Sequence, residues 1–264
     1  MAGFPIWYEL MAPDAGAVAP LYHAVLGWQI PAQGTVLPNG SEYRMIGRAD
    51  GGNAGGVLTL TAPMIEGGAA PGWLTYFHVD DVDAAFAKAV ELGGTAWMEP
   101  VSMPGAGRMA MLSDPDGAPF YLMTPTPPPG QPDAKSDVFD NKRAGHCWWN
   151  QLNTSDAAVA DAFYKALFGW NTDSTMPMGA AGDYRFIHVE GVPVGAINPM
   201  KPAGTRDAWL PFFGVADIDA ARAAALANGF TITMDTHQVP GDDWIFEGHD
   251  PAGVAVGFVG PRKA

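Results

Sequence analysis

Alternating apolar and polar positions predict short strands, each followed by an amphipathic helix. Residues 6–12 alternate in this way and precede Asp14, a good N-cap for a helix that Gly27 ends. Residues 73–80 repeat the pattern, with Asp81 as the cap. Three shorter strands are predicted after each helix, near 28–31, 43–47 and 56–61, and near 95–99, 108–113 and 119–124. The pattern therefore predicts a β-α-β-β-β unit that occurs twice in the first half of the chain.

The second half repeats the first. The sequence YHAVLGW at residues 22–28 reappears as YKALFGW at residues 164–170, shifted by 142 residues. Further along, residues 73–85 match residues 209–221. The β-α-β-β-β unit therefore occurs four times, twice in each half, and the predicted fold class is α+β.

A proline-rich segment separates the two copies. Residues 124–132 read TPTPPPGQP, which is too rich in proline for a helix or a central strand and is typical of an extended spacer. We therefore predict a first domain over residues 1–124, a linker over 125–144 and a second domain over 145–264. The two halves are expected to be separable folding units, and the sequence leaves open whether the four units pair within or across the halves.

Composition and charge narrow the classes of partner. Of the 264 residues, 48% are hydrophobic and 16% are charged, which allows a dense core and excludes an intrinsically disordered chain. The formal net charge of -14 repels phosphate backbones and anionic membrane surfaces. We therefore expect neither nucleic acid nor a membrane as a partner.

Cysteine usage and the N-terminus bear on location. Cys147 is the single cysteine, so no internal disulfide can form, as is usual in a reducing compartment. Residues 1–10 contain no basic residue and include Glu9, unlike a signal peptide. No apolar run approaches the roughly 20 residues of a membrane helix. These features predict a soluble cytoplasmic protein, and the sequence leaves open whether it is a monomer or a homodimer.

The repeated units resemble the vicinal oxygen chelate superfamily. The resemblance rests on the four units, the capping aspartate after the first strand, and the DPDG turn at residues 114–117 before the last strand, and it covers nearly all of residues 5–124 and 145–260. That superfamily includes glyoxalase I, extradiol dioxygenases, fosfomycin resistance proteins and bleomycin-binding proteins. The chain looks most like the two-domain bacterial glyoxalase-like members. The resemblance implies two domains with curved mixed sheets around cavities, and it leaves the activity open.

The resemblance also indicates where a metal would bind. In metal-dependent members, His or Glu ligands project from the first and last strands of each unit. Motif spacing carries those positions onto Trp7, Thr59, Leu74, Tyr121, Trp149, Pro199, Leu210 and Gly257. A divalent metal needs imidazole, carboxylate or thiolate ligands, and none of these residues supplies one. We therefore predict no metal site of the family's usual kind and no cofactor.

A candidate ligand site takes the place of the metal site in the first half. Because side chains alternate along a strand, Glu9 shares a face with Trp7, and Tyr76 shares a face with His78. Together with Tyr121, these residues are predicted to line a cavity and to bind a planar or cationic compound through charge, hydrogen bonds and ring stacking. The matching positions of the second half lack the ionisable pair and hold Trp149, Gln151, Phe212 and Gly214.

Three function hypotheses follow. The first is a metal-free small-molecule binding protein of the bleomycin-resistance type, with its ligand in the first-half cavity. The second is a metal-dependent lyase or dioxygenase with a displaced metal at Glu9 and His78. The third is a structural or interaction module without a pocket function, in which Glu9 and His78 serve only core hydrogen bonding. The residues identify no catalytic group.

Overall fold

A computed structural model describes residues 2–263, which form the four predicted units. The first half contains, in order, β1 (Pro5–Ala12), α1 (Ala15–Leu26), β2 (Thr35–Val36), β3 (Glu42–Gly47), β4 (Asn53–Thr59), α2 (Ala62–Glu66), β5 (Gly72–His78), α3 (Val82–Glu91), β6 (Thr95–Met103), β7 (Gly107–Ser113) and β8 (Pro119–Pro125). The second half contains β9 (Cys147–Asn153), α4 (Ala157–Phe168), β10 (Thr175–Pro177), a 3₁₀ turn (Gly179–Ala181), β11 (Asp183–Val189), β12 (Val192–Asn198), β13 (Ala208–Gly214), α5 (Ile218–Ala227), β14 (Thr231–Gln238), β15 (Trp244–His249) and β16 (Ala255–Gly260).

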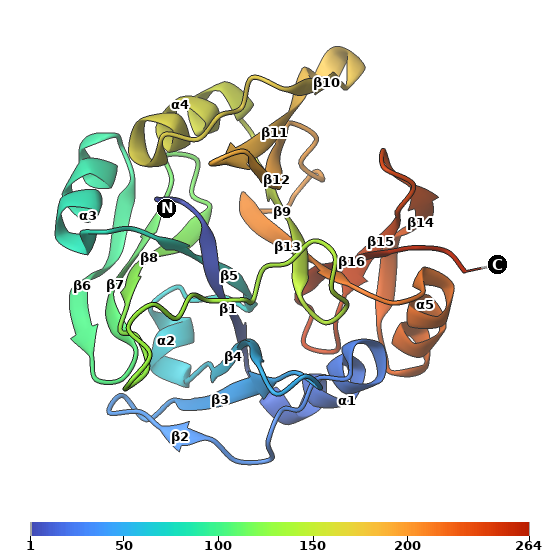
Figure 1. Ribbon diagram of the computed structural model, residues 1–264, viewed down its shortest axis with the longest axis horizontal. Coiled ribbons are helices and arrows are strands. Elements are labelled where there is room, and N and C mark those ends of the chain that lie inside the picture. Colours follow the sequence, from blue (N-terminus) through green and yellow to red (C-terminus); the bar gives the residue numbers. More distant parts are fainter. Residues whose placement is uncertain (1, 264) are drawn as a thin grey trace. The chain divides into compact units, whose positions relative to one another are not determined.

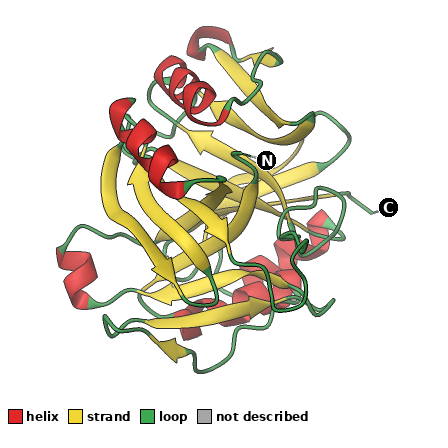
Figure 2. Cartoon of the chain, turned by 60° about the vertical axis from the view of Figure 1, so that its left-hand side comes forward, coloured by secondary structure: helices red, strands yellow, loops and turns green. Residues whose placement is uncertain are grey.

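Strands of residues 2–263 form two eight-stranded sheets, one from each half. The order is β2-β3-β4-β1-β5-β8-β7-β6 in the first and β10-β11-β12-β9-β13-β16-β15-β14 in the second, so the duplicated sequence gives duplicated topology. Both sheets are mixed, because β1 pairs with β4 and β5 with β8 in parallel while β3 and β4 pair antiparallel. Figure 2 shows the curved strands and short helices. The predicted α+β fold class is confirmed.

One predicted strand is displaced. Near residues 28–31 the structure has an isolated bridge between Gln29 and Gly47, and the strand before β3 is the short β2 instead. The reason is Pro31, which has no backbone N–H to donate to a sheet. The short helix α2 was not predicted either.

Aspartate caps begin the main helices, as predicted. The Asp14 and Asp81 carboxylates accept hydrogen bonds from backbone N–H groups at the start of α1 and α3, and Asp156 and Asp217 do the same for α4 and α5. Helix α1 ends at Gly27, whose φ of 69° is the left-handed conformation that glycine adopts without strain. None of the helices within residues 2–263 is long and apolar enough to cross a bilayer.

By their contacts, the residues form two compact units that each combine segments of both halves. The α1/α5 unit contains residues 7–74, 137–148 and 211–264, and the α3/α4 unit contains residues 75–136 and 149–210 with the first few residues of the chain. In Figure 1, α1 and α5 lie side by side, as do α3 and α4. That the halves separate as folding units at residues 125–144 stays a prediction.

A buried tyrosine fastens the core of the α1/α5 unit. The Tyr22 hydroxyl donates a hydrogen bond of 3.0 Å to Asp250 Oδ2 and accepts one of 3.1 Å from Trp73 Nε1. The Trp28 ring stacks on Tyr22 with centroids 5.5 Å apart. Asp250 also accepts backbone N–H bonds within its own turn, so the turn motif holds helix α1 as well as the β15–β16 connection.

The α3/α4 unit repeats this arrangement. The Tyr164 hydroxyl donates to Asp114 Oδ2 at 3.2 Å and accepts from Trp209 Nε1 at 3.1 Å, while Trp170 stacks on the Tyr164 ring. Burial raises the pKa of Asp114 to about 6. The DPDG turn, a generic motif by sequence, thus carries a buried carboxyl group that ties β7 and β8 to helix α4.

Candidate functional site

Trp7, Glu9 and Tyr43 form one cluster in the α1/α5 unit, here termed the first-half cluster. Trp7 and Glu9 lie two residues apart on β1, and Trp7 Nε1 donates a hydrogen bond of 2.8 Å to the Tyr43 hydroxyl on β3. The Glu9 side chain is buried, with 3% of its surface exposed. Burial raises the pKa of Tyr43, and the Glu9 carboxylate raises it further. Tyr43 is therefore a neutral phenol next to a buried acidic group.

The strand register explains why Tyr43 lies near Glu9. Glu9 pairs with Gly56 across β1 and β4, and Tyr43 on β3 pairs with Leu58. A Cβ atom on Gly56 would lie 2.1 Å from the Tyr43 hydroxyl oxygen. The hydroxyl therefore lies over the glycine that faces Glu9, and the missing side chain makes room for it.

The second half has a neutral counterpart, here termed the second-half cluster, in the α3/α4 unit. Trp149 Nε1 donates to the Tyr184 hydroxyl at 2.9 Å, and that hydroxyl donates to Gln151 Oε1 at 2.9 Å. Gln151 Nε2 and Asn198 Nδ2 both donate to Asn153 Oδ1, at 2.9 and 2.8 Å. Hydrogen bonds between neutral side chains thus link all five residues.

The two clusters differ in what surrounds the central side chain. Met11 and Leu58 occupy the positions that Asn153 and Asn198 hold in the second half, and both are buried. Glu9 therefore has apolar neighbours on its own strand face and on β4, where Gln151 has amides. A carboxylate among apolar side chains is costly unless a charged or hydrogen-bonding partner compensates it.

The remaining predicted ligand residues lie in the α3/α4 unit. Tyr76 on β5 and Tyr121 on β8 are register partners whose rings stack with centroids 4.0 Å apart and an interplanar angle of 10°. His78 lies next to Met123 on β8, with Nδ1 3.9 Å from Asp80 Oδ1. The structure thus brings Tyr76 and Tyr121 together, and separately Trp7 and Glu9. That all five line one ligand site stays a prediction.

The residues at the family's metal-ligand positions do not fit a divalent metal. The indole N–H groups of Trp7 and Trp149 donate to tyrosine hydroxyls and offer no lone pair to an ion. Leu74 and Leu210 are buried and apolar. The space next to Gly257 is filled by the Phe212 ring, 2.2 Å from where a Cβ atom would lie.

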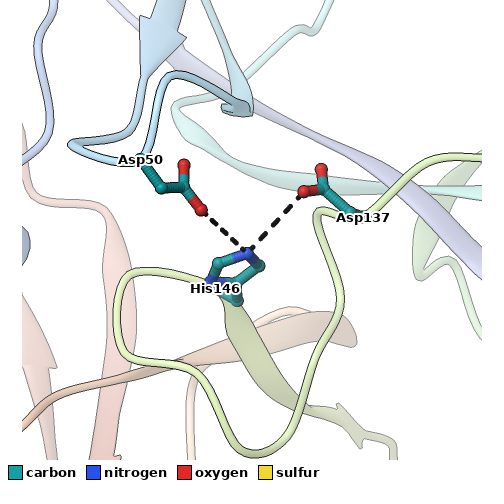
Figure 3. Close-up of side chains that lie close together, drawn as sticks. All are labelled: Asp50, Asp137 and His146. Atoms are coloured by element: carbon teal, nitrogen blue, oxygen red, sulfur yellow. Dashed lines mark ion pairs between the residues drawn. The ribbon is translucent and has the colours of Figure 1, made fainter.

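Asp50, Asp137 and His146 form a second polar group, in the α1/α5 unit (Figure 3). The His146 ring is 1% exposed, and its Nε2 lies 3.8 Å from Asp50 Oδ2 and 3.9 Å from Asp137 Oδ2. On the other side of the ring, Nδ1 lies 3.3 Å from the carbonyl oxygen of Ala144. One imidazole and two carboxylates at these distances resemble a metal-ligand set.

Two arginines already neutralise those carboxylates. Arg48 binds Asp50 through Nε at 3.1 Å and Asp137 through Nη2 at 2.5 Å, and Arg143 Nη2 lies 2.5 Å from Asp50 Oδ2. A divalent cation would have to displace or approach both guanidinium groups against charge repulsion. We therefore interpret these five residues as a charged cluster that fastens the end of the predicted linker to the β3–β4 turn.

A cavity of about 600 Å³ lies in the α3/α4 unit, away from the residues of the first-half cluster. Its lining residues are Gly169, Asn171, Asp173, Ser174, His188, Glu190 and Gly191. None of the predicted ligand residues lines it. The cavity predicted in the first half stays a prediction.

Sequence reasoning missed Tyr43 and the charged cluster. A signal for Tyr43 existed, because the sequence YRMI at residues 43–46 recurs as YRFI at residues 184–187. The charged cluster joins distant parts of the chain, such as Asp50 and Arg143 at a separation of 93 positions, and no local sequence pattern indicates it.

Comparisons with known proteins agree with this fold. Residues 6–122 match the family described as the Glyoxalase/Bleomycin resistance protein/Dioxygenase superfamily. CFP32 of Mycobacterium tuberculosis (strain CDC 1551 / Oshkosh), provisionally named a glyoxylase, is 30% identical over 98% of this chain and 95% of its own length. The anthracycline biosynthesis protein DauV of Streptomyces sp. (strain C5) is 27% identical over 90% of this chain and 86% of its own length.

Solved structures share the fold at low sequence identity. A Mn(II)-bound glyoxalase from Novosphingobium aromaticivorans superposes with a TM-score of 0.65 at 14% identity, over 99% of this chain and 83% of that one. An extradiol ring-cleaving dioxygenase from B. fuscum has a TM-score of 0.65 at 15% identity, over 99% and 73%. With the duplicated sheets and the relative matched along nearly its whole length, these findings show that the chain belongs to the glyoxalase/bleomycin resistance protein/dioxygenase superfamily.

Proposed function

We propose that this chain is a metal-free small-molecule binding protein of the glyoxalase/bleomycin-resistance type, with its ligand at the first-half cluster. The observation that carries the proposal is the acidic Glu9 among Trp7, Tyr43 and apolar neighbours, at the position where the second half has the neutral Gln151. A carboxylate where the other repeat has a neutral amide gives the first-half cluster a group that can bind a cation through a charge-assisted contact.

The cluster favours a planar cation or a planar hydrogen-bond donor. The carboxylate attracts positive charge, and aromatic rings such as that of Trp7 stack on flat ligands. A charge-assisted contact of this kind contributes roughly 1.5 to 3 kcal/mol, or about ten- to a hundredfold in the dissociation constant. Anthracyclines contain a planar fused-ring system, so the name of the relative DauV supports a ligand of this shape.

The binding half of the proposal is tested by a ligand screen. Planar cationic and planar neutral metabolites are screened by thermal shift, and the hits are titrated against wild-type protein, Glu9→Gln and the matched control Gln151→Ala. We expect Glu9→Gln to weaken cationic hits by about ten- to a hundredfold and Gln151→Ala to leave them unchanged. Hits that ignore the Glu9 change and weaken with the Gln151 change would move the site to the second half.

The metal-free half is tested by elemental analysis. We expect no stoichiometric transition metal in the purified protein, because Trp7, Leu74 and Tyr121 offer no suitable ligand at the family's positions. The second function hypothesis predicts the opposite result. One tightly held nickel, zinc, iron or manganese ion per chain, lost in Glu9→Ala or His78→Ala, would establish the displaced metal site of a lyase or dioxygenase.

A further inference from the structure

Glu247 is a half-buried acidic residue of the second half, in the α1/α5 unit. It lies on β15 next to Phe246, whose fully buried ring packs against Phe258 in the core. Because side chains alternate along a strand, Glu247 projects from the opposite face of the sheet. That face is partly open to solvent, since Glu247 and its neighbour Ile245 on the same face are both only half-buried.

Apolar side chains lie on both sides of Glu247. Glu247 pairs with Gly257 on β16, which in turn pairs with Phe212 on β13. The Phe212 ring covers Gly257, because a Cβ atom on that glycine would lie 2.2 Å from the ring. On the other side, Glu247 pairs with Met234 on β14. The acidic side chain therefore has an aromatic ring over one neighbouring strand and a thioether on the other.

Within residues 2–263, no side chain donates a hydrogen bond to the Glu247 carboxyl group. Burial raises the pKa of this group, and the charge of His237 on β14 offsets part of that effect. A half-buried carboxylate can accept a charge-assisted hydrogen bond from a ligand, and such bonds are stronger where water is partly excluded. Glu247 thus offers a ligand an acceptor that the protein itself does not occupy.

The equivalent position of the first half holds the uncharged Met111. Met111 pairs with Tyr121 on β8, as Glu247 pairs with Gly257 on β16. The ring of Tyr121 stacks on that of Tyr76 and fills the place that glycine leaves open in the second half. The acidic side chain is therefore a property of the second half alone, and the duplication of the fold does not require it.

The surroundings of Glu247 suit an organic cation better than a metal ion. A divalent metal needs several converging ligand atoms, and the described residues bring three such groups together only at Asp50, Asp137 and His146. An ammonium ion can bind a single carboxylate, and it gains from an aromatic face and apolar contacts nearby. We propose that Glu247 and the Phe212 ring form a second ligand site, which binds a small organic ammonium ion. This site is separate from the first-half cluster and does not depend on the proposed function.

The test compares two fluorinated probes of the same shape. At neutral pH, para-fluorobenzylamine is an ammonium ion and para-fluorobenzyl alcohol is uncharged, and fluorine NMR measures the dissociation constant of each. The titrations use Glu9→Gln as the parent protein, so that a cation at the first-half cluster does not contribute. We expect Glu247→Gln in this parent to weaken the amine about tenfold or more and the alcohol by less than about twofold.

Two further variants keep the test decisive. Glu247→Met introduces the side chain that Met111 has at the equivalent position, so it can replace Glu247→Gln if that variant folds poorly. We expect the same selective loss of the amine. The control Glu66→Gln removes one negative charge from the exposed end of α2 and should change neither probe.

Each result supports or overturns the second site. Selective weakening of the amine by the Glu247 variant supports it. Equal weakening of both probes, no change, or no binding of the amine to the parent protein overturns it. Equal loss of the amine in Glu66→Gln would show that net charge alone attracts it, and would also overturn the site. The proposed function survives all of these outcomes, because it is tested by Glu9→Gln against the wild type.

Discussion

The two repeated clusters share their tryptophan and tyrosine and differ in one charge. In the second half, Trp149, Tyr184 and Gln151 are neutral and continue into asparagine amides. In the first half, Trp7 and Tyr43 keep the same bond, and Glu9 brings a carboxyl group into surroundings made apolar by Met11 and Leu58. The duplicated scaffold thus carries one neutral cluster and one that contains a buried acidic side chain. The predictions below test how far this asymmetry extends.

The largest expected effect is the same in both halves, because the tryptophans that bond the core tyrosines are equivalent. Trp73 and Trp209 are buried, and each donates to a tyrosine hydroxyl at 3.1 Å. We expect Trp73→Ala and Trp209→Ala each to lower the free energy of unfolding by about 3 to 5 kcal/mol. Urea unfolding followed by circular dichroism measures both. Losses that differ by more than about 2 kcal/mol would show that the equivalent tryptophans do not contribute equally to the stability of the two halves.

Exchanging the charged and the neutral side chain between the two clusters should change the free energy of unfolding in opposite directions. Gln151→Glu replaces an amide that donates to Asn153 by a carboxylate facing the same oxygen, so we expect a loss of about 2 to 3 kcal/mol in unfolding free energy at neutral pH. Glu9→Gln should be neutral or stabilising, because it removes a buried charge. Thermal and urea unfolding of the two single variants test this. Equal destabilisation by both would mean that Glu9 is part of a satisfied structural network.

The sequence predicts the local features of this fold and misses the contacts that depend on how the strands are ordered. Caps, strand alternation and the repeat are local signals, so Asp14, Asp81 and the shared face of Trp7 and Glu9 could be predicted. Tyr43 could not be placed near Glu9, because their proximity depends on β4 lying between β3 and β1 in the sheet. The bond between Tyr164 and Asp114 was also hidden, since it joins the two halves of the sequence.

Stability should depend on pH through the buried turn aspartates. Burial raises the pKa of Asp114 to about 6, above the value of about 3.9 in an unfolded chain, so the folded state binds the proton more tightly. This site therefore adds stability as the pH falls from about 6 to about 4, by up to about 3 kcal/mol. Burial raises the pKa of Asp250 as well, which gives the other unit a contribution of the same sign.

The measurement compares pH profiles of unfolding free energy for the wild type, Asp114→Asn and Asp250→Asn. Other carboxylates, such as Asp207 beside Lys201, have lowered pKa values and act in the opposite direction, so the difference between profiles is the informative quantity. Each variant should lack part of the stabilisation on acidification. Profiles parallel to that of the wild type would show that the turn aspartates do not titrate in this range.

The smallest expected effect concerns the segment between the halves. The charged cluster predicts that the two parts of this segment differ in their susceptibility to proteolysis. Residues 125–136 precede the cluster, whereas Asp137, Arg143 and His146 are bound to the β3–β4 turn. Limited proteolysis should therefore cut the wild-type chain first within residues 125–136.

Arg48→Met removes the buried guanidinium that joins Asp50 to Asp137, so cleavage should extend into residues 137–145 with a loss of only about 1 kcal/mol in stability. Arg222→Met, which breaks an exposed ion pair with Asp235, is the control and should leave the cleavage pattern unchanged. Early cleavage inside β5 to β8 would contradict the predicted boundary and show that the two halves do not separate as folding units.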